Sequence, residues 1–163
     1  MSDSQEEVKS YKEVLTTIRA RVMGALKPPA RLDVSEWADS HMHLSPEASS
    51  EPGIWRTSRA EYQRGMMDAV SDKTVETVVI MSSAQIGKTA ITLNMIGYYV
   101  HQDPSPMLVI QPTLDMAQTF SRDRLAPMVR DTPVLSGLIM DSKSRDSGNT
   151  ILKKQFPGGH ITT

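Results

Sequence analysis

One short stretch of the sequence carries residue types that could bind phosphate. Its sequence is Ser82-Ser83-Ala84-Gln85-Ile86-Gly87-Lys88-Thr89, between an apolar run and a helix-like pattern. This is the form of a phosphate-binding loop, in which backbone N–H groups and the N-terminus of the following helix surround phosphate oxygens. Lys88 would reach the β- and γ-phosphates, the Thr89 hydroxyl would ligate Mg²⁺, and Gly87 would let the backbone approach closely. Ser82 stands where the general pattern has its first glycine.

The elements around this phosphate loop (residues 82–89) support the interpretation. Residues 77–81 are apolar and predict a strand, and apolar residues recur through 90–99 as in a well-buried helix. The alternative is an ordinary strand–turn–helix corner with a surface lysine. The strand–loop–helix context favours phosphate binding.

Further elements follow on both sides. Residues 58–70 predict a helix with a capping box of Ser58 and Glu61 and a buried face that includes Tyr62 and Met66. Residues 107–110 predict a strand buried on both faces. Residues 114–129 predict a helix, interrupted by a proline, with Met116, Phe120 and Leu125 facing inward. Residues 150–162 predict a hairpin, and the βαβ order predicts a parallel α/β sheet with a right-handed crossover.

The N-terminal region predicts two helices that precede the nucleotide-binding region. Residues 5–26 carry an a/d stripe, which predicts either packing on the chain's own domain or docking to a partner. Its members are Val8, Tyr11, Leu15, Ile18, Val22 and Ala25. A short helix anchored by Trp37 and capped by Asp33 or Ser35 should follow. We expect a helical arm over residues 1–45, a linker over 46–57 and a nucleotide-binding region over 58–163.

Composition narrows the class of protein. The 163 residues carry a net charge of −1 and contain no cysteine, which excludes disulfides and thiolate sites. The sequence has no apolar run long enough to span a membrane, so we expect a soluble, intracellular protein. His41 and His43 have no third ligand at a suitable spacing, so a zinc site is not expected. Residues 138–141 superficially resemble an apolar strand that ends in a Mg²⁺-binding aspartate, but Pro133 and Gly137 favour a turn there.

From about residue 34 to residue 163 the chain resembles the N-terminal part of the lambda-type (GpA-like) phage terminase large subunit. Besides the phosphate loop, the segments that carry the resemblance are Ser35-Glu36-Trp37-Ala38, Pro52-Gly53-Ile54-Trp55-Arg56, Val109-Ile110-Gln111-Pro112-Thr113-Leu114-Asp115-Met116-Ala117, Arg145-Asp146-Ser147-Gly148-Asn149-Thr150 and Phe156-Pro157-Gly158-Gly159-His160. The resemblance implies an ASCE-type P-loop ATPase domain that uses ATP and Mg²⁺. The family couples ATP hydrolysis to DNA packaging, and a nuclease domain follows the ATPase domain.

The resemblance also implies roles for particular residues. Lys88 and Thr89 take the phosphate and Mg²⁺ positions, and Tyr62 and Gln63 resemble the adenine-recognising motif. A solvated glutamine is the alternative at position 63. Residues 111–113 resemble a segment turned toward nucleic acid. Three arginines either contact DNA phosphates or lie on a solvated helix face, and both alternatives stay open. They are Arg122, Arg124 and Arg130.

Two departures from the family limit these expectations. Ala84 stands where many large terminases have an arginine. The family's catalytic glutamate, its acidic strand and its nuclease domain are expected beyond residue 163, so a truncated motor fragment is implied. The implied partners are double-stranded viral DNA, the terminase small subunit, the portal or procapsid, and further copies of the chain, in the cytoplasm of the bacterial host. The alternatives are a non-enzymatic interaction piece that acts through residues 5–26 and an inactive prophage remnant.

Overall fold

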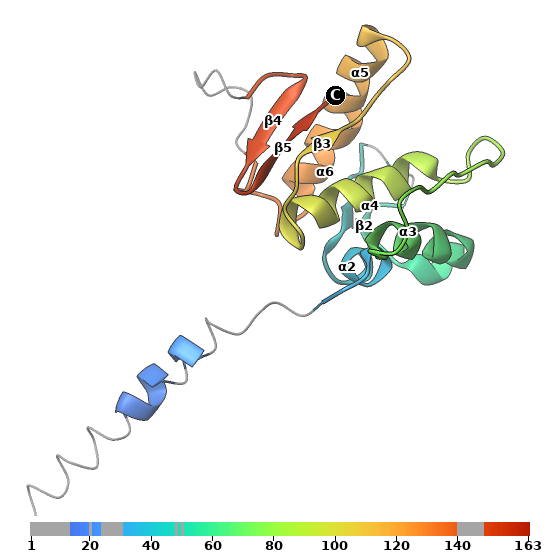
Figure 1. Ribbon diagram of the computed structural model, residues 1–163. Helices are drawn as coiled ribbons and strands as arrows, with labels where there is room; N and C mark the ends of the chain where they lie inside the picture. The colour runs from blue at the N-terminus through green and yellow to red at the C-terminus, as the bar shows by residue number, and fades with distance from the viewer. Residues whose placement is uncertain (1–13, 20, 24–30, 48, 50, 140–148) are drawn as a thin grey trace, which may run out of the picture. The chain divides into compact units, whose positions relative to one another are not determined.

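The computed structural model describes residues 14–19, 21–23, 31–47, 49, 51–139 and 149–163 (Figure 1). The chain divides into two compact units, Met1–Ala30 and Arg31–Thr163. The boundary that the sequence predicts after residue 45 therefore falls inside the second unit. The assignment of residues 1–45 to a functional arm stays a prediction.

In the first unit, residues 14–19 and 21–23 are helical, in agreement with the predicted helix. Leu15, Ile18 and Val22 of the apolar stripe have about half of their surface exposed. The other members of the stripe, Val8, Tyr11 and Ala25, lie outside the described residues.

The second unit begins with helix α2 (Val34–His41), as predicted from its cap and its tryptophan. Asp33 is the N-cap residue, and its backbone N–H donates to Glu36 Oε2 at 3.1 Å, which is one half of a capping box. Trp37 is fully buried, and its indole Nε1–H donates to His101 Nδ1 at 3.1 Å. This bond joins α2 to the last residue of the helix that follows the phosphate loop.

A two-stranded antiparallel sheet follows, made of β1 (His43–Leu44) and β2 (Gly53–Ile54). His43 pairs with Ile54 and Leu44 with Gly53. Strand β2 therefore lies within the predicted linker of residues 46–57. Trp55 is buried just beyond β2, and its Nε1–H donates to Thr57 Oγ1 at 3.0 Å.

The next segment starts as a 3-10 helix, η1 (Thr57–Gln63), and continues as α3 (Arg64–Ser71). The predicted capping box is wrong, because Arg56 is the N-cap residue and Glu61 instead accepts a hydrogen bond from Arg64 Nε at 2.5 Å. That hydrogen bond lowers the pKa of the Glu61 carboxyl.

The buried face of this segment also differs from the prediction. Gln63 is 3% exposed and Met67 is fully buried, whereas Tyr62 is 56% exposed. Met66 is half-buried. The physical reason is that Tyr62 and Gln63 belong to a 3-10 helix, whose period of about three residues per turn differs from the α-helical period on which the prediction depended.

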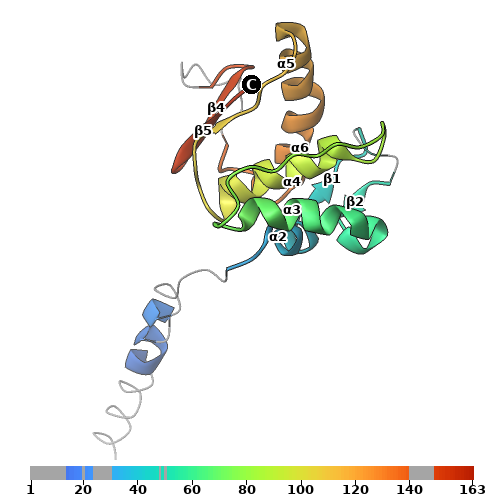
Figure 2. The same ribbon diagram turned by 45° about the vertical axis from the view of Figure 1, so that its right-hand side comes forward.

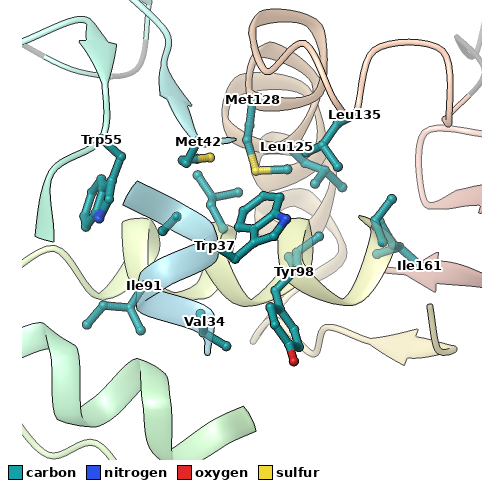
Figure 3. Packing of buried hydrophobic residues seen from close by; sticks show 14 of the residues in the cluster. Val34, Trp37, Met42, Trp55, Ile91, Tyr98, Leu125, Met128, Leu135 and Ile161 are labelled. Carbon is teal, nitrogen blue, oxygen red and sulfur yellow. The ribbon is translucent and has the colours of Figure 1, made fainter. Parts of the chain in front are cut away.

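Helix α4 (Lys88–His101) directly follows the phosphate loop, as predicted. Figures 1 and 2 show it between α2 and α3 on one side and α6 on the other. Seven of its residues are buried: Ile91, Leu93, Asn94, Ile96, Gly97, Tyr98 and Val100. Trp37, Met128 and Leu135 belong to the same hydrophobic core (Figure 3). Helix α4 thus holds the phosphate loop to the centre of the fold.

The sheet differs from the prediction. The second sheet has the strand order β3-β5-β4, from β3 (Met107–Leu108), β4 (Lys153–Phe156) and β5 (Gly159–Thr162). The predicted hairpin is confirmed, with β4 antiparallel to β5, and β3 pairs parallel to β5. The fold is therefore mixed α/β.

Residues 77–81 form no strand, so the predicted strand before the phosphate loop is wrong for this structure. Val79 is 84% exposed and Met81 is 97% exposed. The physical reason is pairing: β3 takes its partner from β5, and none of the described strands pairs with residues 77–81. The predicted burial of residues 107–110 is also wrong, since Leu108 and Ile110 are mostly exposed.

The predicted helix of residues 114–129 is divided into three parts. These are α5 (Leu114–Phe120), a π-helical turn η2 (Ser121–Leu125) and α6 (Ala126–Asp131). Pro127 lies in the first turn of α6, where a missing N–H costs nothing. Leu125 is fully buried as predicted and Phe120 is half-buried, but Met116 is 49% exposed. The π turn breaks the period of 3.6 residues between Met116 and Leu125.

The environment of His41 predicts a pH dependence of stability. The His41 and His101 rings lie 5.2 Å apart between centroids, and burial and the neighbouring His101 both lower the pKa of His41 below 6.5. The unfolded chain then binds more protons than the folded chain near pH 6, so stability falls as the pH drops below about 6.5. We expect the Tm to fall between pH 7.5 and pH 5.5, and His41→Gln to flatten that decline. A decline unchanged in this variant would contradict the assignment to His41.

Candidate nucleotide-binding site

The phosphate loop forms a tight turn with two residues in the left-handed region. Gln85 has φ 61° and Gly87 has φ 86°. A positive φ at a non-glycine residue costs free energy, and such residues concentrate at binding sites. The turn ends in α4, whose first backbone N–H groups have no partner within the helix and carry partial positive charge. The local backbone therefore has the features of an anion-binding turn.

Gly87 is required at its position for two reasons. It is the N-cap residue of α4, with φ 86° and ψ 23°, a conformation that L residues adopt at a cost. A Cβ at this position would lie 2.6 Å from Nε2 of Gln63, so the Gln63 side chain would have to move. The glycine predicted for close backbone approach thus also leaves room for the chain's own glutamine.

Lys88 and Thr89 are both exposed at the start of α4. The Lys88 Nζ donates to the backbone carbonyls of Ser82 and Ser83, at 3.3 and 3.0 Å. The ammonium group therefore lies against the first two residues of the phosphate loop, and binding a phosphate would exchange these neutral carbonyl acceptors for anionic oxygens. The Thr89 hydroxyl is on the same exposed turn.

Tyr62 and Gln63 lie against the phosphate loop, about twenty residues away in sequence. Gln63 Nε2 donates to the Ile86 carbonyl at 2.7 Å, and the Tyr62 hydroxyl donates to the same oxygen at 3.0 Å. The structure therefore brings together all the residues that the sequence predicted for nucleotide binding. Their adenine-recognising role stays a prediction.

A cavity of about 460 Å³ opens beside the phosphate loop, a volume within the usual range for small-molecule sites. Four loop residues line it: Gln85, Gly87, Lys88 and Thr89. The remaining wall is largely apolar and comes from the segment that follows α2, which includes β1, and from α4, η2 and α6. It includes Met42, Leu44, Trp55, Ala90, Leu93, Arg124 and Met128.

The residues present fit a magnesium–nucleotide group. The phosphate loop supplies backbone amides, Lys88 supplies a cation, and Thr89 supplies a hydroxyl of the kind that ligates Mg²⁺. The buried Gln63 Oε1 accepts no hydrogen bond from the described residues, which leaves an acceptor available beside the loop. Within the described part of the chain, no group of three or more His, Asp or Glu residues is placed to hold a metal ion.

Sequence reasoning missed the wall contributed by residues 42–55. Met42, Leu44 and Trp55 close the cavity, although this segment reads as a linker because it is rich in Ser, Pro and Glu. The apolar residues at its two ends were the available signal. Arg124 lines the cavity together with Lys88 and Thr89. Its spacing in the sequence could not predict this position, because it is one of several exposed polar residues on a helix.

Several residues that the sequence predicted to contact DNA or Mg²⁺ lie elsewhere in the chain. Arg130 forms ion pairs with Asp131 and Glu47, at 2.7 and 3.2 Å. Thr113 is the N-cap residue of α5 and accepts from the Met116 N–H at 3.2 Å. Contacts of these segments with DNA stay predictions. Asp141 lies outside the described residues.

Comparison with known proteins identifies a family. The large terminase subunit of Enterobacteria phage P21 is 27% identical over 159 residues, 98% of this chain and 24% of that protein. The large terminase subunit of Escherichia phage lambda is 28% identical over 142 residues, 87% of this chain and 22% of that protein. The chain thus spans about a quarter of the length of these curated relatives. No solved structure matches it. Residues 49–163 match the family model described as phage terminase large subunit gpA, ATPase domain, and the chain belongs to this family.

Proposed function

We propose that this chain is the ATP-binding part of a viral DNA-packaging motor, in which ATP hydrolysis drives DNA translocation in the complete protein. One observation carries the proposal. The phosphate loop ends in a left-handed Gly87, places Lys88 and Thr89 on the first turn of a buried helix and borders a cavity of suitable size. Membership of the gpA ATPase family supports the same function.

The proposal assigns a role to each part of the site. Backbone amides of residues 82–89 and the Lys88 ammonium would hold the phosphates, and the Thr89 hydroxyl would ligate Mg²⁺. Bound Mg²⁺ would neutralise phosphate charge. Tyr62 and Gln63 would border the adenine. In the complete protein, residues 77–81 would pair with a further strand in an ASCE-type parallel sheet, because that pairing would bury the apolar side chains that are exposed here.

The partners follow from the same proposal. They are double-stranded viral DNA, the terminase small subunit, the portal or procapsid, and further copies of the chain, in the cytoplasm of the bacterial host. The exposed stripe of Leu15, Ile18 and Val22 is a suitable face for the small subunit, since helices dock through apolar stripes. Deleting residues 1–30 should then abolish binding of the small subunit.

The described residues include no helix with the length and apolar character needed to cross a membrane.

The proposal is tested by thermal unfolding with and without ligand. We expect Mg·ATP at 100 times its Kd to stabilise the chain by about 2.7 kcal/mol, which raises the Tm by several degrees. Thr89→Ala should remove the part of this stabilisation that depends on Mg²⁺, and Thr89→Ser should retain it because the hydroxyl remains. Absence of any ligand-dependent shift in the unmutated chain would overturn the proposal.

A further inference from the structure

Among the described hydrogen bonds that join the phosphate loop to another element, the one from Gln63 is the shortest. Its side chain is almost completely buried at the end of η1, and Nε2 donates to the Ile86 carbonyl at 2.7 Å. The carbonyl that it holds lies between Gln85 and Gly87, the two left-handed residues of the loop. One hydrogen bond from a buried side chain is therefore placed at the centre of the strained turn.

The orientation of the Gln63 amide follows from its surroundings. A carbonyl oxygen at 2.7 Å requires a donor, so the NH₂ group and not Oε1 must face Ile86. The same NH₂ group fills the space that a side chain at position 87 would occupy, at 2.6 Å from an ideal Cβ. The donor half of this amide is thus committed to the phosphate loop by both hydrogen bonding and packing.

The second donor to the Ile86 carbonyl, the Tyr62 hydroxyl, contributes less to the stability of the turn. The Tyr62 hydroxyl donates to it at 3.0 Å, but the Tyr62 side chain is 56% exposed. Water can replace an exposed donor at small cost, whereas a carbonyl that loses a buried donor is left without a replacement partner. The turn therefore depends on Gln63 more than on Tyr62.

We propose that Gln63 is a positioning residue of the phosphate loop, holding Ile86 so that the backbone at Gln85 and Gly87 keeps the conformation that receives phosphate. This inference rests on the proposed function. It differs from adenine recognition, because a glutamine that acts through the loop affects every ligand that carries the phosphates. A glutamine that reads only the base affects ATP alone.

The first arm of the test uses no nucleotide. In backbone NMR spectra of the full chain, Gln63→Glu and Gln63→Met should shift the Ile86 carbonyl ¹³C and Gly87 amide resonances, because both variants remove the donor at nearly constant side-chain length. Gln155→Glu is the matched control, since Gln155 is exposed on β4 and undergoes the same change of charge. Unchanged Ile86 and Gly87 resonances in both Gln63 variants would overturn the inference.

The second arm measures the Kd of Mg·ATP, Mg·GTP and Mg-tripolyphosphate. Gln63→Glu should weaken all three by about 10-fold at pH 8. As the pH falls toward 5.5, the introduced carboxyl group protonates and can donate to Ile86, so the ratio of variant to unmutated Kd should approach one. Tyr62→Phe should have a smaller effect. A loss confined to ATP would instead identify a base-reading residue.

The two arms separate this inference from the proposed function. If the unmutated chain binds none of the three ligands, the proposed function fails, and the ligand-free resonances still decide whether Gln63 positions the loop. If the ligands bind and the Gln63 variants change neither affinity nor resonances, the inference fails alone.

Discussion

Lys88→Ala is expected to weaken Mg·ATP binding by about 100-fold and to leave the Tm of the ligand-free chain nearly unchanged. Hydrogen bonds from a charged group contribute about 1.5–3 kcal/mol, and about 2.7 kcal/mol corresponds to 100-fold in Kd. Lys88 is exposed and its ammonium bonds only to carbonyls of its own loop among the contacts described, so folding depends little on it. Isothermal titration calorimetry measures the affinity.

The matched control is Lys73→Ala, which removes the same charge from an exposed turn after α3. Because exposed charges are screened over about 10 Å at ordinary salt, this control should change the Kd by less than about 2-fold. Equal losses in the two variants would show that Lys88 acts through net charge rather than through contact with phosphate.

Trp37→Ala is expected to destabilise the second unit by about 3–5 kcal/mol. The indole is fully buried and lies directly on the backbone of Gly97, where an added Cβ would come within 2.2 Å of Cη2. Truncation leaves a cavity between α2 and α4 and removes the hydrogen bond to His101. Since domains are stable by only about 5–15 kcal/mol, much of the margin would be lost.

Urea unfolding followed by far-UV circular dichroism measures this loss, because the tryptophan fluorescence itself changes in the variant. Trp37→Phe should cost less, since it keeps an aromatic ring in contact with Gly97 and loses only the N–H and part of the volume. A loss below about 1 kcal/mol for Trp37→Ala would contradict the packing of α2 on α4.

The parts of the fold that the sequence predicted correctly depend on local signals. Helix α2 has its capping residues at Asp33 and Glu36, and α4 has an apolar pattern long enough to fix both its type and its burial. The β4–β5 hairpin follows from the turn at residues 157–158 between two short runs of strand-forming residues. In each case the information lies within about fifteen residues.

The parts that failed depend on partners distant in sequence. An apolar run such as residues 77–81 shows strand propensity, but a strand exists only when a neighbour supplies the hydrogen bonds. The choice of β5 as the neighbour of β3 joins residues more than fifty positions apart. Propensity could not reveal it.

The site was partly predictable for the same reason. The loop chemistry of Gly87, Lys88 and Thr89 is local and was read from spacing. The contact between Gln63 and Ile86 joins two segments twenty-three residues apart. The resemblance to the terminase family placed Gln63 near the nucleotide, but it could not show which atom its amide holds.

Binding of a magnesium–triphosphate group by the phosphate loop is tested most directly by an isothermal titration of the unmutated chain with Mg·ATP, repeated in the presence of excess Mg-tripolyphosphate. We expect saturable binding with one site per chain and competition by tripolyphosphate, because the contacts are made to phosphates. Heat indistinguishable from dilution, or binding that tripolyphosphate leaves unchanged, would show that the loop does not bind the triphosphate.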